Sequence, residues 1–436
     1  MVGVKQVKNE FTFWPIGQGL FYTGIIKNFI FVYDIGVSAS YRSQYLDNSI
    51  LEFEKSVKKA KKNDSKIIDV LFLSHYDIDH ISGIKKLKAR GFTILKIIAP
   101  LITPLDELSW LKSIADSTDS NSTSANASVV RYDLKTEISR VSESVTFVVP
   151  IADQGNFEQQ FLLEREEGQS IDIEELGNNM ESKVSGLTTM NLRGIWEFKF
   201  YVQSYHALWI KKWFDELINY LDSKYGTNLK TQTGNAKTNK EIADKIYTVV
   251  NQYCLGNSTN DLELLIDEIR REAKKLKIKK EKANKISLIL YHRPINISLN
   301  YNQTLRKRYF TKTHRLHLYS LNAQLLTGDS VFVNINKIKN ISTPTNEWNV
   351  FQSELRKFKN IGVMLLPHHG AKYGWQPALL WQKCCFVVSY GLKNSYHHPD
   401  PSVVKSILSS FSHFNGRLIY VNERPKNRLS IIVHIP

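Results

Sequence analysis

The stretch His75-Tyr76-Asp77-Ile78-Asp79-His80 places four side chains that can bind a metal ion within six residues. It directly follows the apolar run Val70-Leu71-Phe72-Leu73, which predicts a buried strand. In α/β proteins, active sites lie at the carboxyl edge of the sheet, where the strands end. The alternative is a surface turn in which an Asp caps a helix that starts near Ile84. Because one cap needs only one carboxylate, four ligand-type side chains favour a metal centre.

This stretch resembles the signature of the metallo-β-lactamase superfamily, His-x-His-x-Asp-His, with Asp77 in place of the second His. Upstream, Gly17-Gln18-Gly19 and Asp34-Ile35-Gly36 are similar to the first hairpin of that family and its structural Asp. The Gly-Gln-Gly turn resembles one branch in particular. That branch contains the soluble domain of the DNA-uptake competence protein ComEC and the pneumococcal phosphorylcholine esterase.

Three downstream motifs follow in the order of the same branch. Thr327-Gly328-Asp329 resembles the turn with the metal-bridging Asp, and Pro367-His368-His369-Gly370 ends an apolar strand. The stretch from Asn394 to Pro399, which contains His397 and His398, resembles the closing element with the last metal-binding His. A lone His or Asp at a strand end is more often a hydrogen-bonded structural residue, so the order of all five motifs carries the resemblance. The matched pieces cover residues 10–95 and 284–436.

The resemblance implies an α/β fold, namely the metallo-β-lactamase αββα sandwich with a helical insertion. Residues 1–150 would form the N-terminal half of this fold and residues 284–436 the C-terminal half. Residues 151–283 would form an acidic loop and a mainly helical insertion. Within that insertion, apolar residues recur at helical spacing in 208–221, and two more helices are expected near 238–253 and 260–282. The insertion would lie over or beside the site, where it offers a surface for a protein partner.

The resemblance also assigns ligand roles to the matched positions. These are His75 and Asp77 for a first metal, Asp79, His80 and His398 for a second, Asp329 as the bridge, and Asp34 as structural support behind the cluster. His398 is preferred to His397 because Pro399 follows it, as in the family. The third ligand of the first metal is a His in most of the superfamily, and here the nearest equivalent is Asn284, with His206 from the insertion as the alternative.

Asp77 and Asn284 both add oxygen to the ligand set. Oxygen-rich sites favour harder ions, so we expect two divalent metal ions, with Mn²⁺ or Mg²⁺ competing against Zn²⁺. Two metals close together suit the hydrolysis of a phosphate ester. Asp79, His368 and His369 would be catalytic, and one of the two His would protonate the leaving group. Because successive strand residues point to opposite faces, only one of this pair should face the metals.

The formal net charge of +16 predicts that the protein attracts polyanions. One basic run, residues 270–282, is equally well explained as the solvated face of a helix. The second run combines cations with aromatic rings and lacks acids, as in proteins that bind single-stranded nucleic acid. Its expected nucleic-acid-binding residues are Arg306, Lys307, Arg308, Tyr309, Lys312 and Arg315.

The 436 residues contain no apolar run near the ~18 residues of a membrane helix and no signal-peptide pattern. The three cysteines form neither a disulfide framework nor a zinc motif, which fits a reducing compartment. We therefore expect a cytoplasmic protein without membrane contact. The oligomeric state stays open.

Together these features favour a metal-dependent phosphodiesterase, specifically a nuclease that hydrolyses DNA or RNA with a dinuclear centre. The resemblance further implies that such a nuclease serves nucleic-acid degradation or antiphage defence. One alternative is a phosphodiesterase of small molecules, such as a cyclic nucleotide or a phosphocholine-type compound. The other is a non-hydrolytic subunit that binds nucleic acid or a partner through a degenerate metal site. The fold cannot decide, because one scaffold hosts many reactions.

Overall fold

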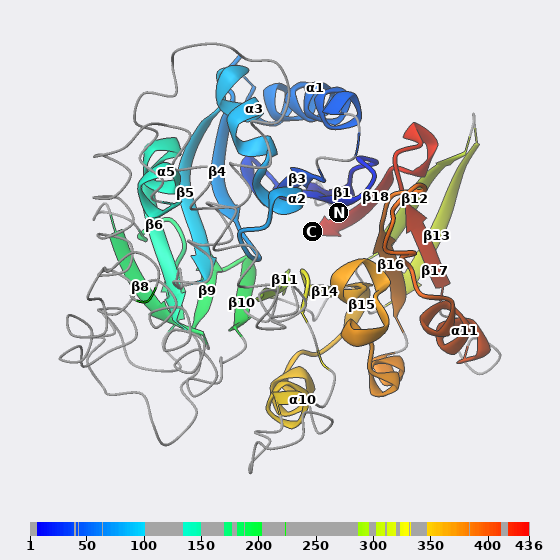
Figure 1. Cartoon of the computed structure of the whole chain (residues 1–436). Helices are drawn as coiled ribbons and strands as arrows, with labels where there is room; N and C mark the ends of the chain where they lie inside the picture. The colour runs from blue at the N-terminus through cyan, green and yellow to red at the C-terminus, as the bar shows by residue number, and fades with distance from the viewer. Residues whose placement is uncertain are drawn as a thin grey trace, which may run out of the picture.

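The computed structural model describes residues 7–38, 41, 43–62, 64–100, 134–149, 170–176, 181–186, 188–202, 223, 287–295, 302–309, 312–319, 323–330, 332, 347–382, 384–410 and 417–435. Within these residues two β-sheets pack face to face and helices cover both outer faces (Figure 1). The expected αββα sandwich is thereby confirmed.

The first sheet contains ten strands among the described residues. In spatial order they are β13 (Lys312–Tyr319), β12 (Asn302–Tyr309), β18 (Leu429–Ile435), β1 (Val7–Phe13), β2 (Gly19–Ile26), β3 (Phe29–Val37), β4 (Ile67–Phe72), β5 (Thr93–Pro100), β6 (Ser142–Val149) and β8 (Glu181–Ser185). The five strands from β3 to β8 run parallel, so their carboxyl ends meet at one edge.

The second sheet contains eight of the described strands. In spatial order they are β17 (Arg417–Val421), β16 (Cys385–Ser389), β15 (Ile361–Leu365), β14 (Ala323–Leu326), β11 (Leu288–Pro294), β10 (Trp196–Val202), β9 (Thr189–Leu192) and β7 (Ser170–Asp172). The four strands β14 to β17 are parallel and end at one edge.

The period of two along each strand separates the core into layers. On β2, Leu20 and Tyr22 lie in the core between the two sheets, whereas Phe21 packs in the core beneath the helices of the first sheet. Helix α1 (Ser43–Lys61) contributes apolar residues to this outer core at helical spacing, among them Ile50 and Phe53.

Short helices complete both outer layers. On the first sheet these are α2 (Ile78–Ile81), α3 (Gly83–Ala89) and α5 (Leu134–Val141); on the second they are α10 (Glu347–Lys357), α11 (Pro401–Ser410) and the 3₁₀ turns η2 (Pro367–Gly370), η3 (Lys372–Gly374) and η4 (Pro377–Gln382). A further 3₁₀ turn, η5 (Pro425–Asn427), precedes β18. No helix among the described residues is long and apolar enough to cross a membrane.

A buried polar network joins the two sheets. His292 Nε2 lies 2.9 Å from the Tyr22 hydroxyl, which donates a 2.9 Å hydrogen bond to Gln324 Oε1. Trp196 Nε1 donates to His292 Nδ1 at 3.2 Å. Burial lowers the pKa of His292 to about 3, so its ring is neutral and this His has a structural task.

The segment assigned to the insertion contributes to both sheets. β8 lies at the edge of the first sheet, while β7, β9 and β10 extend the second. The described part of residues 151–283 therefore belongs to the sandwich itself. The helices expected at 208–221, 238–253 and 260–282 lie outside the described residues.

Candidate metal centre

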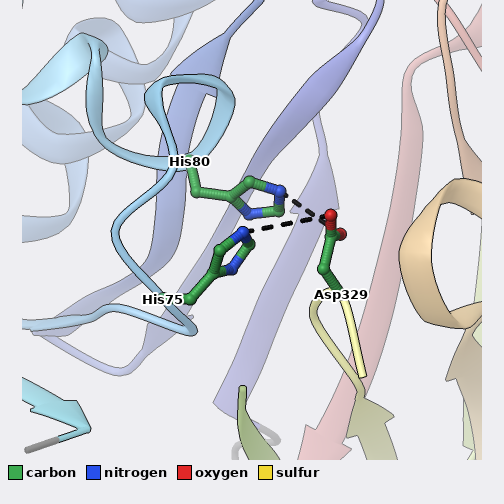
Figure 2. A group of neighbouring side chains, drawn as sticks. All are labelled: His75, His80 and Asp329. Atoms are coloured by element: carbon green, nitrogen blue, oxygen red, sulfur yellow. Dashed lines mark ion pairs between the residues drawn. The ribbon is translucent and has the colours of Figure 1, made fainter. Parts of the chain in front are cut away.

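The strand ends that carry the sequence motifs meet at one edge of the sandwich. β4 of the first sheet leads to His75 and then to α2, which contains His80. β14 and β15 of the second sheet lead to Asp329 and to the His368-His369 pair. Figure 2 shows His75 and His80 turned toward the carboxylate of Asp329, which approaches from the opposite side. The site is therefore shared between the two sheets.

The first group of ligand-type atoms consists of His75, His80 and Asp329, whose donor atoms all lie within 4.8 Å of one another. His75 Nε2 is 3.9 Å from Asp329 Oδ2, and His80 Nε2 is 3.3 Å from Asp329 Oδ1. Asp77 Oδ2 lies 3.8 Å from His75 Nε2 on the same side. Asp77 thus lies close to His75, although it belongs to neither compact group.

The second group consists of Asp79, His80 and His369, again within 4.8 Å of one another. His369 Nε2 is 3.6 Å from Asp79 Oδ2 and 3.7 Å from Asp329 Oδ1. Asp329 therefore faces this group with Oδ1 and faces His75 with Oδ2. A carboxylate in this position can bridge two ions.

Buried nitrogens without hydrogen-bond partners gather at this point. Among the described residues they include His75 Nε2, His80 Nε2, His368 Nδ1, His369 Nε2 and His398 Nδ1. More than ~90% of buried polar groups in proteins are paired, so a cluster of unpaired imidazole nitrogens needs an explanation. His75, His80 and His369 belong to the two compact groups, and a divalent cation accepts the lone pairs of their Nε2 atoms together with carboxylate oxygens. The residues present fit a metal ion.

For His75, His80 and His369, the opposite ring nitrogen is held by a second residue. His80 Nδ1 lies 2.8 Å from Asp34 Oδ2, and His369 Nδ1 donates to the backbone oxygen of Ser389 at 2.8 Å. His75 Nδ1 lies 2.9 Å from Ser74 Oγ. With the proton on Nδ1, each ring presents the lone pair of Nε2 to the site, as metal-binding His residues do.

Asp34 supports the cluster from behind. It is fully buried and accepts hydrogen bonds from Ser74 N at 2.7 Å and from Ser74 Oγ at 2.6 Å, besides its contact with His80. Ser74 immediately precedes His75, so one carboxylate fixes the ends of the motif. The contacts of Asp34 with Ser74 and His80 are consistent with the supporting position expected for it.

Glycines allow α2 to sit directly on the first sheet. A Cβ atom on Gly36 would lie 2.5 Å from the backbone nitrogen of His80, and one on Gly19 would lie 2.7 Å from the backbone oxygen of Asp79. Neither neighbour is a flexible side chain that can move away. Gly19 and Gly36 therefore allow the backbone of Asp79 and His80 to pack directly against β2 and β3.

Both His residues of the His368-His369 pair face the site, which corrects the expectation that only one would. They do not continue the strand: their φ angles are 48° and 54°, in the left-handed region that non-glycine residues rarely adopt. His368 Nδ1 lies 3.6 Å from Asp329 Oδ2, while His369 approaches Asp79. The turn replaces the alternation of a strand and brings both rings to one side.

His398, expected to complete the second ligand set, lies farther out. Its ring centroid is 5.7 Å from that of His368, and Asp79 and His80 are joined by His369 instead. His397 is exposed, whereas His398 is half-buried, so His398 is the residue of this pair that borders the site. His398 lies beside His368 on the outer side of the centre.

The electrostatics of the centre favour a cation. Burial by itself would raise the pKa of Asp79 and of Asp329, but the neighbouring imidazoles hold both pKa values below their usual range. Burial and the proximity of His80 lower the pKa of His75. Burial would also lower the pKa of His80, yet Asp329 and Asp34 raise it well above its usual value. The buried Asp329 and the partly buried Asp79, both anionic, therefore lie among imidazoles whose protons an ion can displace.

A known protein family matches part of this chain. The family model described as "Metallo-beta-lactamase superfamily" matches residues 24–116, which include Asp34 and the whole His75–His80 motif. The chain contains a metallo-β-lactamase superfamily domain. Among solved structures, the metallo-beta-lactamase fold protein YhfI from Bacillus subtilis is similar at 11% identity with a TM-score of 0.19, over 46% of this chain and 55% of YhfI. The match thus spans about half of that protein. No curated protein matches the chain.

Several expected site residues of the metallo-β-lactamase domain are not placed at its centre. Asn284 and His206, the alternatives for a third ligand of the first metal, lie outside the described residues. The basic segment forms the hairpin of β12 and β13 at the edge of the first sheet.

Two supporting residues were missed by sequence reasoning. Ser74 could have been recognised from its position directly before His75. The backbone oxygen of Ser389 carries no sequence signal.

Proposed function

We propose that this protein is a metal-dependent phosphodiesterase with a dinuclear centre, and that its substrate is DNA or RNA. The position of Asp329 carries the proposal, because its Oδ2 lies 3.9 Å from His75 Nε2 and its Oδ1 lies 3.7 Å from His369 Nε2, so that each oxygen faces a different imidazole. Members of the superfamily are generally hydrolytic enzymes that bind divalent metals. The five motifs also support assignment to the competence-type branch and a role in cytoplasmic nucleic-acid degradation or antiphage defence.

The proposal divides the described residues between two ions and assigns His80, which belongs to both compact groups, to the second. His75, Asp77 and Asp329 would hold one of them. Asp79, His80 and His369 would hold the other, together with Asp329. Such a pair supplies a water of lowered pKa and positive charge beside the developing charge of the phosphate. The identity of the ions is part of the proposal, and the oxygen of Asp77 supports Mn²⁺ or Mg²⁺ beside Zn²⁺.

His368 is left over for proton transfer. It belongs to neither compact group, yet its Nδ1 lies 3.6 Å from Asp329 Oδ2 and has no hydrogen-bond partner among the described residues. Imidazole is the side chain that most often acts as a general acid in enzymes. From this position His368 would donate a proton to the leaving oxygen of the phosphodiester.

The basic hairpin supports a polymeric substrate. One row of paired residues crosses the first sheet through Lys307, Leu429, Phe13, Tyr22, Tyr33 and Phe72. β12 runs in the same direction as β4, so Arg308 and Tyr309 follow Lys307 toward the edge where His75 follows Phe72. Five strand steps of about 4.8 Å separate β12 from β4, a span of about 24 Å. A nucleic-acid strand can bridge this distance, whereas a small phosphodiester cannot.

The test measures hydrolysis of single- and double-stranded DNA, RNA and bis-p-nitrophenyl phosphate with added Mn²⁺, Mg²⁺ or Zn²⁺. Asp79→Ala should reduce every metal-dependent rate by more than about 100-fold, because it removes a ligand. Asp47→Ala, which removes a carboxylate on α1 that pairs with Lys86, is the matched control and should keep full activity.

The outcomes separate the candidate functions. Cleavage of polymer well above that of the small ester supports the nuclease. Activity restricted to small esters would favour the small-molecule phosphodiesterase. If every substrate is untouched and the purified protein carries no metal, the proposal fails and a non-hydrolytic binding subunit takes its place.

A further inference from the structure

An exposed aromatic ring stands at the rim of the metal centre. Tyr396 lies in the loop between β16 and α11, and 57% of its surface is exposed. It is the most exposed of the large hydrophobic residues in the described part of the chain. Most of the described aromatic side chains are buried in the sandwich, and it is the contact of this exposed ring with the imidazoles of the site that gives it interest.

The loop that carries Tyr396 is fixed by its own hydrogen bonds. Asn394 Nδ2 donates to the backbone oxygens of Gly391 at 2.6 Å and His398 at 2.8 Å, and Asn394 Oδ1 accepts from His398 N at 2.8 Å. The hydroxyl of Tyr41 accepts from Lys393 N at 2.7 Å. These bonds bracket Tyr396 on both sides, so the loop presents the ring in a defined place.

Tyr396 connects to the centre through two imidazoles. Its ring is stacked on His398, with centroids 5.9 Å apart and planes inclined by 16°. His398 in turn meets the edge of His368 at 5.7 Å and 86°. His368 contacts Asp329, the residue shared by both ligand groups. A continuous line of rings thus leads from Asp329 to an exposed aromatic face.

We propose that Tyr396, supported by His398, is a stacking platform for a nucleobase adjacent to the scissile phosphate. The proposal deepens the function proposed above and rests on it. Stacking suits a nuclease without sequence preference because every base has a flat π-face. His398 backs the ring and leaves the outer face of Tyr396 free for the base.

His398 is the second residue of the proposed stacking platform. Its half-buried ring has a buried Nδ1 without a hydrogen-bond partner among the described residues. Since His369 completes the compact ligand group, His398 is free to contact the substrate between the base and the phosphate. This assigns His398 to substrate positioning.

The first experiment measures binding without hydrolysis. Single-stranded oligonucleotides containing 2-aminopurine are titrated in EDTA, where stacking of the fluorescent base on a ring quenches its emission. Tyr396→Ala should weaken binding about tenfold and abolish the quench, because stacking on an aromatic side chain is lost. Tyr396→Phe retains the ring and should behave as wild type. Leu408→Ala, which truncates another exposed apolar side chain, is the control.

The second experiment compares substrates in the metal-loaded protein. Tyr396→Ala should raise KM for an oligonucleotide. It should not change the hydrolysis of an oligomer that lacks the base expected to stack on Tyr396. If the variant binds and cleaves oligonucleotides as wild type does, the platform is wrong even though the nuclease stands. If wild type neither quenches 2-aminopurine nor binds oligonucleotides but binds phosphocholine, the ring recognises a cationic headgroup and the proposal is overturned. Failure of the nuclease itself would appear separately, as no metal-dependent cleavage by wild type.

Discussion

At the residue scale, the metal centre depends on groups that hold the far nitrogen of each imidazole. Asp34 holds His80, Ser74 holds His75, and the backbone of Ser389 holds His369. Each contact fixes the orientation of its ring and leaves Nε2 available. These residues therefore hold the rings in an arrangement that could accept a metal ion.

Measuring the metal content of variants can distinguish the roles of His369 and His398. His369→Ala should lose about one ion per chain, because His369 lies among Asp79, His80 and Asp329. His398→Ala should keep both ions, because its ring contacts His368 and Tyr396 rather than the compact group. Inductively coupled plasma mass spectrometry of the purified variants measures this.

Circular dichroism of both variants serves as the control, since each must remain folded for the metal count to mean anything. The reverse pattern, with an ion lost only in His398→Ala, would restore the ligand set that the sequence motifs imply.

Sequence reasoning could identify the ligand candidates because each lies where a strand ends. It assigned the second metal to His398, whereas the structure brings His369 together with Asp79 and His80. That arrangement depends on two consecutive left-handed residues, His368 and His369, for which the sequence offers only the following Gly370 as a hint. The third ligand of the first metal, sought at Asn284 or His206, stays a prediction.

At the scale of elements, the position of α2 is set by glycines of the neighbouring strands. Gly36 on β3 and Gly19 on β2 contact the backbone of Asp79 and His80. The motifs containing these glycines could be recognised in the sequence. The reason why these positions require glycine could not be recognised, because it is a close approach between segments that lie more than 40 residues apart in the sequence.

Gly36→Ala tests this packing. The added methyl group would meet the backbone of Asp79 and His80 at 2.5 Å, so α2 must move outward. We expect a loss of about 1–3 kcal/mol in the free energy of unfolding, measured by urea denaturation. We also expect weaker metal binding, measured by isothermal titration calorimetry.

Gly91→Ala is the matched control. Gly91 has a φ of +78°, yet nothing lies within 4 Å of its missing Cβ. This variant should therefore lose about 1–2 kcal/mol through backbone strain alone while binding metal as wild type does. Equal metal affinity in both variants would contradict the role of Gly36.

At the scale of the whole molecule, the sandwich brings chemistry from distant parts of the chain to one edge. Asp34 and the His75–His80 motif come from the first sheet, and Asp329 and the His368-His369 pair come from the second. This architecture could be predicted because five motifs follow the family order. The division of the chain into two halves and an insertion was harder to predict. Strands as short as β7 and β9 show no clear hydrophobic pattern in the sequence.

The basic hairpin provides the test at this scale. Arg306 and Arg315 lie opposite each other in the register of β12 and β13, so Arg306→Ala combined with Arg315→Ala removes two neighbouring charges. Oligonucleotide binding should weaken, and the slope of log K against log salt should fall by up to about 2, because each phosphate contact releases counterions. Hydrolysis of bis-p-nitrophenyl phosphate should be unchanged, since that substrate does not reach β12. Lys55→Ala combined with Lys59→Ala on α1 removes the same charge from an exposed helix face. An equal change of slope in this control would mean that the hairpin acts only through net charge and does not contact the strand.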